Sequence, residues 1–90
     1  MTTYTLILTK QGRSYRITKR NSVGGCSGGD TARNLVGALW TAFMRQADEY
    51  PIRTVVVNGE PMPKPEVLAL LSGMPSGASA ALAKATAMLD

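Results

Sequence analysis

The strongest constraint on the fold is a pair of segments near the N-terminus in which apolar and polar residues alternate. Tyr4–Thr9 and Ser14–Arg20 are rich in Thr, Ile, Leu and Tyr, and they alternate with the period of a β-strand. Gln11 and Gly12 lie between the two segments, and glycine suits the positive φ of a two-residue turn. The sequence therefore predicts a β-hairpin over residues 4–20.

The position of the turn decides which side chains share a face of this hairpin. A turn at residues 11–12 sets Leu8 opposite Tyr15 and Leu6 opposite Ile17, which creates one apolar face. The other face carries threonine, serine and arginine, with Ile7 as its one apolar member. A slip of one residue would mix the two faces, so their clean separation supports the hairpin.

A glycine-rich stretch, SVGGCSGGDT, follows the hairpin, and we interpret residues 22–30 as a flexible linker. Its glycines are spaced as in a phosphate-binding loop, but Asp30 stands where that motif has a lysine and would repel phosphates. Cys26 is the only cysteine, and the absence of histidine excludes Cys-His and Ser-His catalysis and most zinc sites. A bare anion site at this loop and a redox role for Cys26 remain open alternatives.

Residues 31–49 have the apolar periodicity of an amphipathic helix, and Asp30 is the expected N-cap. The apolar stripe covers about half of the helical wheel, which is wider than one sheet face requires. Trp40 lies at its margin, where it would contact a second element of the chain or a partner. Pro51 ends the helix, because the residue before a proline avoids the α region.

The rest of the chain predicts a third strand and two short helices. Residues 52–57 include three consecutive valines, which are typical of a covered or central strand. A turn at Asn58-Gly59 and the prolines of PMPKP allow at best an edge strand after it. The two helices are expected over residues 65–72 and 78–89. The second is rich in alanine, so it would dock within the chain or pack against a second copy as a homodimer.

Together these elements predict an α+β fold in a single domain of 90 residues. A small antiparallel sheet, formed by the hairpin and the third strand in the order ββαβ, packs on one long amphipathic helix, and two short C-terminal helices follow. The sequence does not say which hairpin strand pairs with the third strand.

Charge points to the N-terminal half as the binding region. The net charge is +4, and residues 1–29 hold five basic residues and no acid. Such a distribution favours an anionic partner, although a basic pI also occurs in proteins with no such partner. Our candidates for partner contact are Lys10, Arg13, Arg16 and Arg20, with Trp40 as an additional apolar contact.

The sequence favours binding over catalysis. Asp48 and Glu49 are adjacent on the predicted helix and point about 100° apart, so they do not converge on a substrate. We expect no enzymatic activity, cofactor or metal. Because there is no signal peptide and no apolar run of membrane-spanning length, we expect a cytoplasmic protein without a membrane partner.

The opening TTYTLILTKQGRSYRITKR, followed by one amphipathic helix and a third strand, resembles small phage and mobile-element proteins, among them the anti-CRISPR proteins. The likeness covers residues 2–58 and concerns size and layout. It implies a non-enzymatic inhibitor that docks on a protein or nucleoprotein complex in a bacterial host cell. The basic N-terminal half favours an acidic protein surface or bound RNA as its target. The alternative is a small nucleic-acid-binding protein that uses the same basic hairpin.

Overall fold

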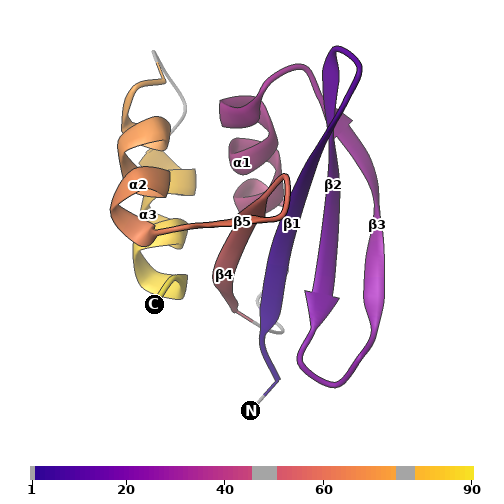
Figure 1. Cartoon of the computed structure of the whole chain (residues 1–90). Coiled ribbons are helices and arrows are strands. Elements are labelled where there is room, and N and C mark those ends of the chain that lie inside the picture. The colour runs from indigo at the N-terminus through magenta and orange to yellow at the C-terminus, as the bar shows by residue number, and fades with distance from the viewer. Residues whose placement is uncertain (1, 46–50, 75–78) are drawn as a thin grey trace.

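The computed structural model describes residues 2–45, 51–74 and 79–90, which form a β-sheet with helices on one of its faces (Figure 1). Its strands are β1 (Tyr4–Gln11), β2 (Ser14–Asn21), β3 (Cys26–Ala32), β4 (Ile52–Val57) and β5 (Glu60–Met62). Its helices are α1 (Leu35–Met44), α2 (Lys64–Ser72) and α3 (Ser79–Met88). The strand order is β3-β2-β1-β4-β5. The predicted α+β class is confirmed, but the prediction of an antiparallel sheet is wrong because β1 and β4 run parallel.

The N-terminal hairpin forms as predicted, with a register shifted by two residues. Gln11 pairs with Ser14 and Leu8 with Ile17, so the turn consists of Gly12 and Arg13 rather than Gln11 and Gly12. Gly12 has a φ of 63°, which suits the first central position of a type II′ turn. Because side chains alternate with a period of two, a shift of two residues leaves the predicted faces unchanged.

The glycine-rich stretch is not the linker that we predicted, because its second half is the strand β3. Asn21 organises the turn before it, since the Oδ1 atom accepts hydrogen bonds from the backbone N–H groups of Val23 and Gly25 at 3.1 and 2.7 Å. β3 then pairs with β2 and contains a bulge at Gly29, which has a φ of 125°. A Cβ atom at Gly28 would lie 2.8 Å from the backbone oxygen of Ile17, so this strand needs its small residues.

Helix α1 begins later than predicted, and its N-cap is Asn34 rather than Asp30. The Oδ1 atom of Asn34 accepts a hydrogen bond from the backbone N–H of Gly37 at 2.7 Å. Asp30 belongs to β3, where its carboxylate forms an exposed ion pair with Arg45 at 3.0 Å. The end of the predicted helix, residues 46–49, lies outside the described residues.

The sheet is completed by β4 and β5. After the edge strand β3, helix α1 forms the crossover connection to β4, which pairs with β1 in parallel. The predicted turn at Asn58-Gly59 is confirmed, with φ values of 51° and 83°. Asn58 also ties the turn to β1, because its Oδ1 atom accepts a hydrogen bond from the backbone N–H of Lys10 at 2.8 Å. β5 is the short edge strand that the prolines permitted.

The core lies between the sheet and the three helices. α1 contacts β1, β2 and β3, whereas α3 contacts β4, and α2 packs on the other two helices. Helices α2 and α3 lie close to their predicted positions, although residues 75–78 are outside the described part. Ala81 and Ala85 are fully buried, so these alanines of α3 pack against the core of the same chain. The most buried large side chains are Phe43, Leu6, Leu8, Leu39, Ile52, Leu71, Val55 and Val67.

Candidate functional site

The candidate site is the face of the sheet that carries no helix in the described part of the chain, which we call the open face (Figure 1). Leu6, Leu8 and Val55 are fully buried under the helices. Since side chains alternate along a strand, their neighbours in β1 and β4 point to the opposite side. The strand register assigns the following positions to the open face: Thr5, Ile7 and Thr9 in β1, Arg16, Thr18 and Arg20 in β2, Cys26, Gly28 and Thr31 in β3, Thr54 and Val56 in β4, and Pro61 in β5.

One row of uncharged residues crosses the open face at right angles to the strands. Ile7 is the register partner of Thr18 on one side and of Val56 on the other. Gly28 extends the row on β3, and Pro61 extends it on β5, so the row reaches both edges of the sheet. Ile7 and Val56 are half-buried side by side at its centre. We call these five residues the central row.

A polar row lies on each side of the central row, and each contains one arginine. Arg16 lies between Thr9 and Thr31, whereas Arg20 lies between Thr5 and Cys26. Both arginines are exposed, and neither has an acidic partner among the described residues. They are four residues apart on one strand, which places their Cα atoms roughly 13 Å apart. The central row therefore passes between two cations.

The open face also lacks acids, within the described residues. Asp30 is the register partner of Ile17 and Glu60 that of Val57, so both carboxylates belong to the side that carries the helices. Glu66 is on α2, and Asp90 follows α3. Hydroxyl groups of threonine supply most of the remaining polarity. The open face thus combines an apolar centre with positive charge.

The edges of the sheet are poorly suited to adding a strand from a partner. At one edge, β5 has three residues, and Pro61 removes a backbone N–H group from it. At the other edge, the bulge at Gly29 interrupts β3. Short strands, prolines and bulges are features that prevent edge-to-edge pairing. The open face is therefore a better contact surface than either edge.

The five residues predicted for partner contact do not form one surface. Arg16 and Arg20 share the open face, and Arg13 is exposed in the turn at the end of the same hairpin. Lys10 pairs with Tyr15, so it belongs to the opposite side of the sheet. Trp40 is half-buried on α1 and packs against the core, also on the opposite side.

The sequence prediction missed the apolar centre of the open face. Ile7 was visible as the one apolar residue on an otherwise polar strand face, and Val56 as part of a valine run that was apolar on both faces. These two signals coincide only when β4 joins β1 in the observed register, which pairs Ile7 with Val56. Local sequence does not encode that pairing.

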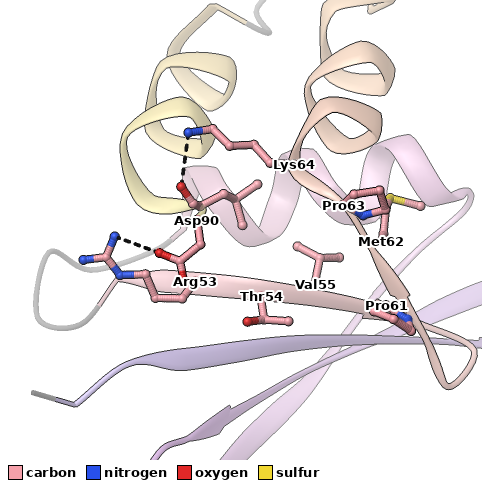
Figure 2. A pocket seen from close by; sticks show the side chains of 9 residues that line it. Arg53, Thr54, Val55, Pro61, Met62, Pro63, Lys64 and Asp90 are labelled. Atoms are coloured by element: carbon pink, nitrogen blue, oxygen red, sulfur yellow. Dashed lines mark hydrogen bonds and ion pairs between the residues drawn. The ribbon is translucent and has the colours of Figure 1, made fainter.

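A cavity of about 330 Å³ lies where β4, β5, α2 and α3 meet, and Figure 2 shows the side chains that line it. The two cationic side chains that line it, Arg53 and Lys64, both donate hydrogen bonds to backbone carbonyl groups of the protein. Lys64 donates from Nζ to the backbone oxygens of Thr86 and Leu89 at 2.9 and 3.1 Å, and Arg53 donates from Nη1 to that of Met88 at 3.1 Å. These contacts satisfy carbonyl groups at the end of α3, so the cations hold this helix in place.

The remaining polar chemistry is sparse. Cys26 is an exposed thiol at the start of β3. Within the described ranges, no group of three or more His, Cys, Asp or Glu residues could hold a metal ion. No helix in the described part is both long and apolar enough to cross a membrane. Within the described part of the chain, the open face combines half-buried apolar side chains with two arginines that have no acidic partner there.

Comparisons with known proteins found no relative of this chain. No protein-family model matches the chain, and no curated protein or solved structure matches it either.

Proposed function

We propose that this chain is a non-catalytic binding protein that docks the open face of its sheet on a macromolecular partner. The observation that carries the proposal is the central row with Arg16 and Arg20 on either side of it. An apolar centre with charged and polar residues around it is typical of protein interfaces. The absence of histidine from the sequence, and of any cluster of three acids or thiols among the described residues, favours binding over acid–base catalysis.

The partner that we propose is a host protein or nucleoprotein complex in a bacterial cell, which the chain inhibits by occupying one of its surfaces. The inhibitory role rests on the resemblance of residues 2–58 to small phage and mobile-element proteins. The basic charge of the open face supports an acidic target surface.

The alternative is direct binding of nucleic acid. The two arginines of the open face, which have no acidic partner among the described residues, favour it, since arginine binds phosphate groups well. However, the described open face contains no aromatic side chain on which a base could stack. Binding to DNA or RNA would therefore depend on charge alone and would fall steeply with salt.

The test compares two variants of the same hairpin with the same change in charge. Arg16→Glu/Arg20→Glu alters the open face, and Lys10→Glu/Arg13→Glu alters the turn and the opposite side. Tagged proteins are used to capture stoichiometric partners from a bacterial lysate. We expect the first variant to lose a partner that the wild type and the second variant retain.

Circular dichroism and chemical unfolding must show that both variants fold. Equal retention or equal loss of the partner by the two variants would show that the open face is not the contact surface. Failure of the wild type to recover any stoichiometric protein would count against a protein target. A gel shift with DNA or RNA at low salt would then identify the alternative.

A further inference from the structure

The geometry of the open face points to one class of partner structure, and we propose that this face receives an amphipathic helix whose apolar stripe has carboxylates along both sides. The inference rests on the proposed function, because it concerns the same face. It adds the shape and the charge pattern of the segment that binds.

The central row matches one stripe of a helix in width and length. It is one side chain wide and passes through Ile7 and Val56. It crosses five strands, or four spacings of about 4.8 Å, which gives roughly 19 Å. About 13 residues of α-helix, at 1.5 Å per residue, cover that length. Three to four turns would therefore lie across the sheet.

The flanking arginines select the charge of the bound segment. Their Cα atoms are roughly 13 Å apart on either side of the central row, and a helix with its side chains is about 10–12 Å across. A helix lying along the central row would cross β2 at Thr18, with Arg16 on one flank and Arg20 on the other. Carboxylates on both sides of the apolar stripe would meet Arg16 and Arg20, whereas lysines there would be repelled.

An extended segment is the less suitable occupant. A bound strand obtains its affinity from backbone hydrogen bonds along a free sheet edge. Here Pro61 removes a donor at one edge and the bulge at Gly29 disturbs the other. A second copy of this chain is also less suitable, because two open faces in contact would bring four arginines together with no carboxylate from the described residues between them.

Synthetic helices provide the test without requiring the natural partner. One peptide carries a leucine stripe with glutamates on both sides, and its control has lysines in place of the glutamates. We expect the glutamate peptide to bind the folded full-length chain, more weakly as salt rises, and the lysine peptide to bind at least about tenfold more weakly. Amide chemical shifts of Ile7, Thr18 and Val56 should change on binding.

Charge reversal supplies the control for the peptide experiment. Arg16→Glu/Arg20→Glu should reverse the preference so that the lysine peptide binds better, whereas Lys10→Glu/Arg13→Glu should keep the wild-type order. Ile7→Ser should weaken binding of the glutamate peptide, but the glutamate peptide should still bind better than the lysine peptide. Circular dichroism confirms the helical state of both peptides and the fold of each variant.

The results separate this inference from the proposed function. Equal binding of both peptides, no binding of either, or shift changes confined to the helices would overturn the inference. Preferential binding of a DNA or RNA oligonucleotide to the open face would also overturn it. In each case, loss of the captured partner by Arg16→Glu/Arg20→Glu would still support the open face as the docking surface.

Discussion

At the scale of single residues, a few positions define where the chain turns and how closely its strands approach. Asn58 adopts a φ of 51° and also accepts the hydrogen bond from the backbone of Lys10. Gly28 lies against the backbone of β2, with no room for a side chain. These residues stabilise the sheet through backbone geometry rather than through burial of apolar surface.

Replacement of Asn58 should separate its two contributions. Asn58→Ala loses the hydrogen bond and places a Cβ-bearing residue without a local polar contact at positive φ, so we expect a loss of about 2 kcal/mol of unfolding free energy. Asn58→Gly removes only the hydrogen bond and should cost about 1 kcal/mol. Denaturant unfolding measures both. Equal stability of the two variants would mean that the backbone conformation contributes nothing.

A pair of glycine replacements tests the close approach of β3 to β2. A Cβ atom at Gly28 would lie 2.8 Å from the backbone oxygen of Ile17, so Gly28→Ala should destabilise the protein by about 1–3 kcal/mol. The control is Gly73→Ala, where the nearest atom, the backbone oxygen of Leu70, would be 3.5 Å away. We expect that control to stay within about 0.5 kcal/mol of the wild type in the same unfolding assay.

At the scale of elements, β3 is the segment whose structure departs most from its local sequence. Glycine is depleted in strands, and CSGGDTA contains two glycines with no large apolar residue. The segment is extended because β2 offers an unpaired edge beside it, and the small residues allow close pairing and a bulge. Tertiary context thus overrides local preference here.

Hydrogen exchange should distinguish this strand from a linker. Backbone N–H groups of β3 that bond to β2 should exchange far more slowly than in the denatured protein, because exchange requires the edge strand to open. NMR measurement of individual amides in residues 26–32 provides the readout. Exchange throughout that segment at the rates of an unfolded chain would instead indicate a flexible linker.

At the scale of the whole molecule, the three helices share one core with the sheet, and within the described ranges no helix covers the open face. α3 enters this core through small side chains, and the cations Arg53 and Lys64 hold its end. Such close packing predicts that the molecule tolerates larger residues on one side of α3 only.

The matched variants Ala85→Leu and Ala83→Leu test this arrangement. Ala85 is fully buried, so a larger side chain there should lower the unfolding free energy by about 1–3 kcal/mol through overpacking. Ala83 is exposed on the same helix, and leucine there should change stability by less than about 0.5 kcal/mol. Chemical unfolding provides both values. Similar effects at the two positions would mean that α3 does not dock through Ala85.

The sequence by itself determined the features that depend on neighbouring residues. Alternation placed Leu6 and Leu8 on the core side, glycine and asparagine marked the turn at Asn58-Gly59, and prolines restricted β5 to an edge. Each follows from sterics or backbone hydrogen bonding within a few residues. Arg16 and Arg20 could be assigned to one face of β2 for the same reason.

Only the tertiary structure decided the features that depend on which segments meet. In the folded chain, residues 26–32 form a strand, although residues 22–30 were predicted as a linker. The N-cap is Asn34 rather than Asp30, and β4 runs parallel to β1. The last pairing brings Ile7 beside Val56 and creates the apolar centre of the candidate site. Pairing of distant strands is selected by the total burial and hydrogen bonding of the folded chain, and no local pattern contains that sum.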